Sequence, residues 1–325
     1  MRPRVFLTQP VAARALDRLR TVADVDMNPD PLRILTPREL ADAVRERDVL
    51  FCLVQDTVTA GVIAAAPRLR LIATMMITPE QIDVAAATAR RIPVTTIPPM
   101  VTEATADLAF ALLLAVARRV AEADGLVRAG VFPGAQSRRL EGHRVAGATL
   151  GLVGAGRVGQ AVARRARGFG MRIVYADPRP LAPAEEAALG ATRAPLDDVL
   201  TTADFVSVHA PHAPETRHLI GAREIGRMKP TAYLINTSRG PIVDEAALVS
   251  ALRAGRIAGA ALDVFEHEPR VASELLAMPN VVLTPHIGSG EVELRERMAD
   301  VVVDNILAVL AGRRPPNCAN PEVYG

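Results

Sequence analysis

The stretch Gly154-Ala155-Gly156-Arg157-Val158-Gly159 decides the fold of this chain, because it places three glycines where a strand would turn into a helix. An apolar segment, 149–153, precedes it, and an Ala- and Arg-rich segment, 157–168, follows it. In a dinucleotide-binding turn, the first glycine permits the tight turn, the second lets a pyrophosphate approach, and the third lets the helix pack against the strand. The amides of Arg157 and Val158 would meet that phosphate at the positive end of the helix.

A carboxylate at the end of the next predicted strand supports this interpretation. Asp177 stands 18 positions after Gly159, close to the spacing of the acidic residue that holds the adenosine ribose hydroxyls. Its charge would repel a 2′-phosphate, so the sequence predicts NAD as cofactor over NADP, although Arg179 could weaken that preference. The alternatives are a purely structural strand–helix turn and, for Asp177, an ordinary strand-end residue before Pro178.

Apolar runs and helical patterns alternate on both sides of the glycine turn, which is typical of parallel sheets covered by helices. In the first hundred residues we expect strands at 5–7, 49–54, 69–75 and 94–97, and helices at 11–22, 37–47 and 82–90. Six further strands, as a doubly wound dinucleotide fold requires, are expected at 149–153, 172–175, 205–208, 232–235, 258–262 and 281–284. Long helices are expected at 102–129 and 291–310.

These patterns predict an α/β protein with two doubly wound domains, since 325 residues are too many for one small core. We expect residues 102–290 to form a Rossmann-type NAD-binding domain. This domain would be inserted into a flavodoxin-like substrate domain made of residues 1–101 and 291–325.

Composition narrows the class of protein. The formal net charge is +2, and the basic residues are spread among Glu and Asp, so no nucleic-acid surface is expected. Cys52 and Cys318 have neither metal-ligand nor disulfide spacing, which indicates a reducing, cytoplasmic location and no metal site. Neither a secretory leader nor a membrane span is expected.

Three later motifs carry a family resemblance. They are Asn236-Thr237-Ser238-Arg239-Gly240, Leu262-Asp263-Val264-Phe265-Glu266 with Glu268-Pro269, and Pro285-His286-Ile287-Gly288-Ser289. Over essentially the whole chain, the sequence resembles the D-isomer-specific 2-hydroxyacid dehydrogenases. It is most similar to the glyoxylate/hydroxypyruvate reductase branch, including Arg313-Arg314-Pro315-Pro316-Asn317. The resemblance implies NAD-dependent interconversion of a 2-oxo acid and a D-2-hydroxy acid. It also implies a homodimer formed through the cofactor domain and its 102–129 helix.

Three residues in these motifs suit that chemistry. An imidazole changes protonation near neutral pH, so His286 can act as the acid and base for the substrate hydroxyl. Glu268, if paired with His286, would orient the ring and favour the imidazolium. Arg239 presents a planar fork that suits a carboxylate. By resemblance these are the three catalytic positions, and Asp263 is the position that contacts the nicotinamide carboxamide. Taken singly, each could be structural.

The remaining expected cofactor contacts lie around these strand ends. By resemblance, the main chain after strand 205–208 lines the cofactor pocket, and two threonine hydroxyls could touch the cofactor. The residues concerned are His209, Ala210, Pro211, Thr216, Thr105, Thr237 and Gly288. The other histidines considered, His143, His218 and His267, are expected on the surface or in loops.

One loop departs from the family pattern. Between Ala73 and Asp83 the family usually has a glycine-containing loop whose amides help to hold the substrate carboxylate, but here Thr78 replaces the glycine and Pro79 follows. Pro79 removes an N–H donor and biases Thr78 towards extended geometry. Pro99 is a second departure, where the family often has glycine.

Two interpretations of the loop remain open: drift that keeps its shape, or a pocket remodelled for a different or bulkier acid. The loop also motivates a second functional class, an NAD(H)-sensing protein similar to the dehydrogenase-like corepressors, with little or no turnover.

Overall fold

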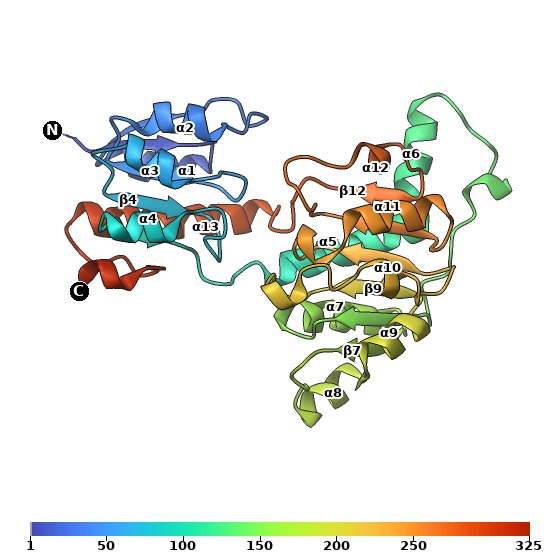
Figure 1. Cartoon of the computed structure of the whole chain (residues 1–325). Coiled ribbons are helices and arrows are strands. Elements are labelled where there is room, and N and C mark those ends of the chain that lie inside the picture. Colours follow the sequence, from blue (N-terminus) through green and yellow to red (C-terminus); the bar gives the residue numbers. More distant parts are fainter. Residues whose placement is uncertain (1) are drawn as a thin grey trace. The chain divides into compact units, whose positions relative to one another are not determined.

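The computed structural model describes residues 2–325, which divide into two compact units. The first unit consists of the residues up to Met100 together with Gly290–Gly325, and the second is Val101–Ser289. Each unit has its own sheet, and every strand pairing in both sheets is parallel (Figure 1).

The first unit has a five-stranded sheet in the order β2-β1-β3-β4-β5. With right-handed crossovers, this order places α1 on one face of the sheet, where it packs on α13, and α2, α3 and α4 on the other. The elements are β1 (Arg4–Leu7), α1 (Ala13–Arg20), β2 (Asp24–Met27), α2 (Pro37–Val44), β3 (Val49–Cys52), α3 (Ala60–Ala65), β4 (Leu71–Thr74), α4 (Val84–Ala89), β5 (Val94–Thr95), α13 (Val292–Leu310) and the 3-10 turn η4 (Pro321–Tyr324).

The second unit has a seven-stranded sheet in the order β12-β11-β10-β9-β6-β7-β8. Helices α5 and α7 pack together on one face, and α9, α10 and α11 lie on the other. The elements are α5 (Thr102–Ala117), α6 (Val120–Arg128), η1 (Arg138–Leu140), β6 (Thr149–Val153), α7 (Arg157–Gly168), β7 (Arg172–Ala176), α8 (Pro183–Leu189), β8 (Ala191–Arg193), α9 (Leu196–Thr202), β9 (Phe205–Val208), η2 (Pro214–Thr216), α10 (Ala222–Ile225), β10 (Tyr233–Asn236), η3 (Gly240–Ile242), α11 (Glu245–Arg253), β11 (Gly259–Leu262), α12 (Ser273–Leu276) and β12 (Val281–Leu283).

The core of the second unit forms two apolar layers, because successive strand residues point to opposite faces of a sheet. Phe205 and Ile235 pack in the layer that contains the residues of α5 and α7. Their neighbours Val206 and Leu234 pack in the layer that contains the residues of α10 and α11. The two sheets, each with helices on both faces, confirm the predicted α/β doubly wound class.

The predicted single helix at 102–129 is wrong. The helix ends at Ala117, and Arg119 adopts a left-handed backbone (φ 54°) before α6 begins. The amide of His143 donates to Ala117 O (2.9 Å), so a distant segment satisfies a carbonyl at the helix end. The sequence around 118–119 contains no proline or glycine that would have announced this break.

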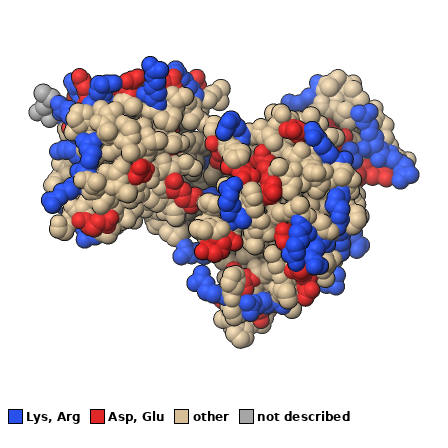
Figure 2. All heavy atoms as spheres, viewed as in Figure 1, with Lys and Arg blue, Asp and Glu red and all other residues tan. Residues whose placement is uncertain are grey.

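The described residues carry charge in a mixed pattern. On the face shown in Figure 2, basic and acidic side chains lie interspersed over each unit, as expected for solvated helix faces. Within residues 2–325, no helix is both long and apolar enough to cross a membrane.

Candidate active site

The glycine turn lies between β6 and α7, at the point where the strand order of the seven-stranded sheet reverses. Gly154 has φ +96°, and a Cβ on it would lie 2.7 Å from Ala210 N. A Cβ on Gly159 would overlap the carbonyl oxygen of Gly154. Both positions therefore require glycine on steric grounds.

The same turn leaves an open cradle for a phosphate. A Cβ on Gly156 would meet no protein atom within 4 Å. No side chain caps the start of α7, so the amides of its first turn, including those of Arg157 and Val158, are available to a ligand. These features fit the pyrophosphate of a dinucleotide.

The predicted ribose-binding carboxylate lies against this turn. Asp177 Oδ2 accepts a hydrogen bond from the Ala155 amide (2.9 Å), and Oδ1 accepts one from the Arg179 amide (2.9 Å). Arg193 donates to the carbonyl oxygens of Asp177 and Pro178, which holds the segment in place. The carboxylate is thus positioned beside the cradle by main-chain contacts.

The segment after β9 packs on the glycine turn from the neighbouring strand. The His209 amide donates to Val153 O (2.7 Å), and Ala210 lies beside Gly154. The His209 ring contacts Ser207 Oγ through Nε2 (2.9 Å), while its buried Nδ1 has no partner among residues 2–325. Burial lowers the pKa of His209 to about 4, so the ring is neutral near pH 7.

Asp263 organises the turn that carries His286. Its buried carboxylate accepts hydrogen bonds from Thr284 Oγ1 (2.6 Å), the Ile287 amide (2.8 Å) and the Gly288 amide (2.8 Å). Burial nevertheless raises the pKa of Asp263 above its ordinary value. The His286 amide donates to Asp263 O (2.8 Å), and His286 has a left-handed backbone (φ 55°). The Asp263 carboxylate therefore fixes the conformation of the turn that carries His286.

His286 and Glu268 form a direct pair, which is the condition on which the predicted role of Glu268 depends. His286 Nδ1 lies 2.8 Å from Glu268 Oε2, and both side chains are about one-fifth to one-quarter exposed (21% and 24%). Glu268 Oε1 accepts the Phe265 amide (3.0 Å), which fixes the carboxylate on its own loop. Because an ionised carboxylate only accepts hydrogen bonds, the proton of the ring lies on Nδ1 and Nε2 is left for a substrate.

Arg239 follows β10 in a turn that is held by side chains. Asn236 Nδ2 donates to Arg239 O (3.0 Å), and Asn236 Oδ1 accepts the Ser238 amide (3.0 Å). The half-buried Arg239 donates through Nη1 to Ser238 O (2.9 Å). Thr237 is buried, and its Oγ1 has no partner within the described chain.

The two threonine hydroxyls predicted to touch the cofactor are engaged within the protein. Thr105 Oγ1 donates to Gly288 O (3.1 Å), which ties the start of α5 to the His286 turn. Thr216 Oγ1 donates to Pro211 O (2.7 Å) and accepts the Ala213 amide (2.8 Å). Their cofactor contacts stay predictions.

The loop after β4 keeps two unused amides despite its unusual residues. Its ends are held by the Met75 amide on Cys52 O (3.2 Å) and the Ile97 amide on Met76 O (2.9 Å). Across residues 2–325, the amides of Ile77 and Thr78 have no hydrogen-bond acceptor. The exposed Thr78 turns its hydroxyl to Glu80 (2.8 Å). Pro79 therefore removes only its own donor.

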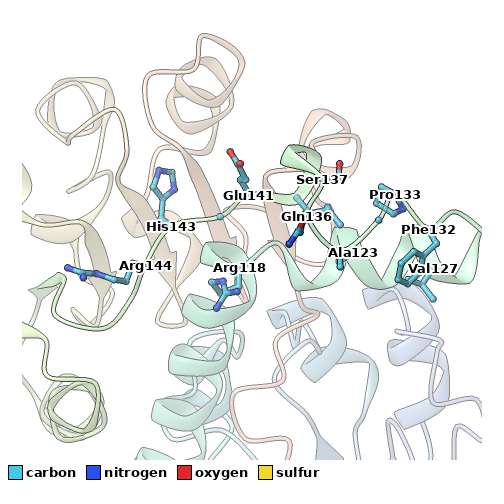
Figure 3. Close-up of a pocket in the computed structure, with 14 residues that line it drawn as sticks. Arg118, Ala123, Val127, Phe132, Pro133, Gln136, Ser137, Glu141, His143 and Arg144 are labelled. Carbon is cyan, nitrogen blue, oxygen red and sulfur yellow. The ribbon is translucent and has the colours of Figure 1, made fainter.

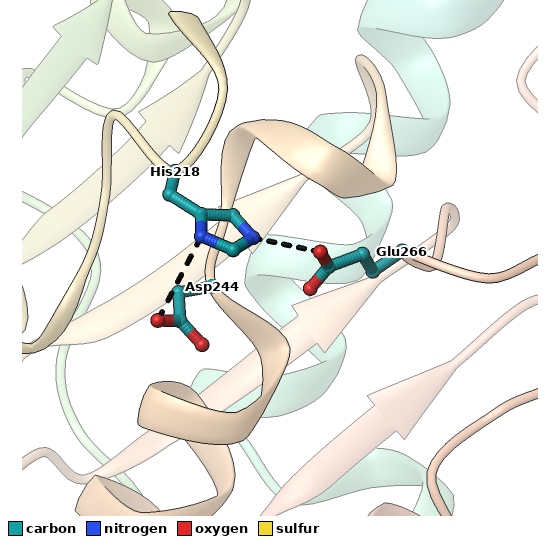
Figure 4. Close-up of side chains that lie close together, drawn as sticks. All are labelled: His218, Asp244 and Glu266. Carbon is teal, nitrogen blue, oxygen red and sulfur yellow. Dashed lines mark hydrogen bonds and ion pairs between the residues drawn. The ribbon is translucent and has the colours of Figure 1, made fainter.

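His218 lies in a turn, as predicted, and its ring is held by two carboxylates. His218 Nε2 lies 2.7 Å from Glu266 Oε1, and Nδ1 lies 3.9 Å from Asp244 Oδ2 (Figure 4). The three residues offer donor atoms within 4.8 Å of one another, as a metal site would. However, the carboxylates face opposite ring nitrogens, and Arg217 donates to the same Glu266 oxygen (2.9 Å). The cluster is therefore a hydrogen-bonded network rather than a metal site. Its only sequence signal was the charged Glu266 within an otherwise apolar motif at a strand end.

Comparisons with known proteins identify the class and then the family. Residues 110–288 match the family model described as "D-isomer specific 2-hydroxyacid dehydrogenase, NAD binding domain". The chain is 45% identical to a glyoxylate reductase of Thermococcus litoralis over 99% of this chain and 98% of the relative. It is 46% identical to a glyoxylate reductase of Korarchaeum cryptofilum over 99% and 97% of the two chains.

A solved structure agrees with these sequence relatives. The NADPH-dependent glyoxylate/hydroxypyruvate reductase of Sinorhizobium meliloti, solved in complex with NADP and malonate, matches with a TM-score of 0.81 and 33% identity. The match covers 98% of this chain and 97% of that one.

The fold and site thus define a dehydrogenase with an NAD-binding domain. The chain belongs to the D-isomer specific 2-hydroxyacid dehydrogenase family, on the side of its glyoxylate/hydroxypyruvate reductases. It interconverts a 2-oxo acid and a 2-hydroxy acid, so the comparisons confirm the predicted activity. They give no support to the NAD(H)-sensing alternative.

Proposed function

We propose that this enzyme reduces glyoxylate, or a 2-oxo acid of similar size, to the corresponding 2-hydroxy acid with NADH. The observation that carries the proposal is the His286–Glu268 pair (2.8 Å), which lies on segments following the carboxyl ends of strands in the same parallel sheet as the glycine turn. Ligands of open α/β sheets bind at that edge. The similarity of the whole chain to glyoxylate reductases supports this choice of acid.

We assign the catalytic roles to three side chains. His286 Nε2 gives a proton to the substrate carbonyl oxygen as it becomes a hydroxyl, and Glu268 holds the ring in the required orientation. Arg239 binds the carboxylate of the acid with its planar fork. Bound NADH would supply the hydride. In the direction of oxidation, the same Nε2 accepts the hydroxyl proton.

The loop after β4 is our second candidate for binding a carboxylate. The Ile77 and Thr78 amides have no acceptor in the part of the chain that the structure describes, and free amides stabilise an anion strongly. Both belong to the segment where the family places its carboxylate-binding loop. We therefore favour the interpretation that Thr78 and Pro79 leave the function of the loop intact.

We propose NAD as the preferred cofactor and place it in the second unit. The cradle would be formed by residues Gly154 to Gly159, with Asp177 on the adenosine ribose and Asp263 towards the nicotinamide carboxamide. His209, Ala210, Pro211, Thr237 and Gly288 would line the same pocket. Asp177 would repel a 2′-phosphate. Arg179, whose side chain is exposed nearby, opposes this preference, and one structural relative is described as NADPH-dependent.

We also propose that two copies of the chain associate through α6 and the segment after it. Helix α6 has no buried residue, and a nine-residue helix is too short to be stable without tertiary packing. Val127 is 60% exposed and Phe132 78% exposed, and they lie side by side at one end of a hollow of about 680 Å³ (Figure 3). A second copy would cover these apolar side chains. Phe132→Asp should then convert a dimer into a monomer in light scattering, whereas a wild-type monomer would refute the proposal.

A cytoplasmic location is proposed because both cysteines are free thiols. A reducing compartment keeps such thiols from oxidising.

The decisive experiment is a panel of 2-oxo acids, run with NADH and with NADPH while nicotinamide absorbance is followed. We expect the highest kcat/KM for glyoxylate or hydroxypyruvate with NADH. A clear preference for a bulkier acid would overturn the proposed substrate, and a preference for NADPH would overturn the role of Asp177. Tight NADH binding without turnover on any acid would instead favour the sensor.

A further inference from the structure

The turn after Arg239 and the loop that carries Glu268 touch each other directly. A Cβ on Gly240 would overlap the carbonyl oxygen of Phe265 and would lie 2.5 Å from Glu266 N. The Phe265 amide, one residue before Glu266, is the group that holds Glu268 Oε1 (3.0 Å). The Phe265–Glu266 peptide therefore contacts both the turn that carries Arg239 and the carboxylate of Glu268. It couples the position of Arg239 to that of the Glu268–His286 pair.

A short segment, 217–220, ties both sides of this contact. The His218 amide donates to Pro241 O (2.8 Å) and the Ile220 amide to Ile242 O (3.0 Å), which fixes the segment along the turn after Arg239. The side chains of Arg217 and His218 both reach Glu266 Oε1, at 2.9 and 2.7 Å. One segment thus binds the Arg239 turn through its backbone and the Glu268 loop through its side chains. Figure 4 shows the His218 ring reaching Glu266.

The charges around Glu266 make this tie strong. The Glu266 side chain is only 8% exposed. Its amide donates to Glu245 Oε2 (3.1 Å), and its Oε2 accepts the Glu245 amide (3.4 Å), so two carboxylates lie close together. Burial acts to raise the pKa of Glu266, but the hydrogen bond from His218 and the charge of Arg217 outweigh it, and the pKa is lowered. A buried carboxylate with satisfied partners is held rigidly.

We propose that His218, together with Arg217, is a positioning residue that sets the geometry of the Glu268–His286 pair relative to Arg239 by holding Glu266. This rests on the proposed roles of those three residues. It goes beyond them because none of Arg217, His218 or Glu266 need touch substrate or cofactor. Misplacing catalytic groups by about 1 Å can cost up to about 100-fold in rate.

The test uses His218→Asn in the full-length protein. Asn tolerates the left-handed backbone of His218 (φ 52°) but is too short to reach Glu266. We expect kcat for glyoxylate reduction to fall about 10- to 100-fold, while the KM for NADH stays within about twofold. Arg223→Gln is the matched control, because it removes exposed ion pairs to Asp197 and Glu224 in the same unit without touching Glu266, and it should leave kcat unchanged.

A double variant separates positioning from general damage. If His218 acts through Glu268, then His218→Asn added to Glu268→Gln should cost no more than about a further twofold in kcat. Multiplying losses, or a His218→Asn variant with wild-type kcat, would overturn the inference.

A second readout does not need turnover. In protein labelled with 15N-histidine, the Nδ1–H signal of His286, assigned by its loss in His286→Gln, should exchange with water at least several-fold faster in His218→Asn than in Arg223→Gln. Unchanged exchange would contradict the inference even in an enzyme whose substrate is still unknown. A wild-type protein that reduces no 2-oxo acid would refute the proposed function separately.

Discussion

The glycine turn of the second unit and the loop after β4 of the first unit both leave backbone amides without a partner among the described residues, but by opposite means. In the turn, Gly154 and Gly159 sit where any Cβ would meet backbone atoms. In the loop, Thr78 is exposed and Pro79 is tolerated, since the loop is held by main-chain hydrogen bonds at its ends. Steric necessity keeps glycine in the first case, whereas the second needs only that its amides stay free.

This difference explains why the glycine turn is easy to recognise in the sequence and the loop after β4 is not. A steric requirement restricts the side chain and is visible in the sequence. A requirement for a free N–H restricts only proline, and only at the positions that donate. A loop can therefore lose its family pattern and keep its free amides.

The largest effect should come from separating chemistry from cofactor binding. His286→Gln removes the proton donor while leaving the glycine turn intact, so we expect kcat to fall about 10²- to 10⁴-fold. The Kd for NADH, from fluorescence titration, should change by less than about threefold. Near-normal turnover in this variant would show that the proton comes from elsewhere.

Adding one methyl group should test the steric requirement for glycine in the turn. In Gly159→Ala the new Cβ would overlap Gly154 O, so the turn must shift. We expect the Kd for NADH to rise about 100-fold and the free energy of unfolding to drop by about 1–3 kcal/mol. Gly168→Ala on the same helix is the control, because its Cβ would meet nothing within 4 Å. If both variants had the same Kd for NADH and the same stability, steric overlap at Gly159 would not explain why glycine is present there.

The segment packed on the glycine turn also carries an acid sensitivity. His209 packs against the turn with a pKa lowered by burial to about 4, whereas the unfolded chain has the ordinary value near 6.5. As pH falls from 6.5 towards 4, the unfolded state binds a proton that the folded state does not, so stability is lost. At pH 5 the loss is about 2 kcal/mol.

Urea unfolding of the wild type and of His209→Gln at pH 7 and pH 5 measures this loss of folding stability. The variant cannot take up that proton, so it should lose about 2 kcal/mol less than wild type between the two pH values. Parallel losses in the two proteins would mean that the ring is protonated in the folded state too.

Much of the fold could be predicted because the central strands are continuous apolar runs. The strands at 149–153 and 205–208 were predicted with their observed limits. The edge strands β2 and β8 were missed, since Asp24, Asp26 and Arg193 break any apolar run and face solvent at least in part. Each of these two strands is defined by its hydrogen bonds to one neighbouring strand, and such pairing leaves no pattern in the sequence.

The candidate site was predictable where a residue's chemistry is local and unpredictable where it depends on distant partners. The chemistry of Glu268 and His286, together with the family resemblance, suggested the pair that the structure shows. Nothing near Asp263 indicated that its carboxylate would gather three donors from residues 284–288. Likewise, the partner of His218 lies 48 positions away. Such contacts are set by the sheet order, which spacing along the chain does not reveal.

The smallest effects are expected in the loop after β4. They test whether its backbone amides, rather than its side chains, bind the acid. Thr78→Gly restores the family residue but leaves both amides in place, so the KM for glyoxylate should change by less than about threefold. Thr78→Pro deletes one amide. Because a hydrogen bond to a charged group contributes about 1.5–3 kcal/mol, and the neighbouring Ile77 amide would compensate in part, we expect KM to rise about tenfold with little change in the Kd for NADH. If Thr78→Gly changed substrate preference and Thr78→Pro did not, the side chain rather than the backbone would control this loop.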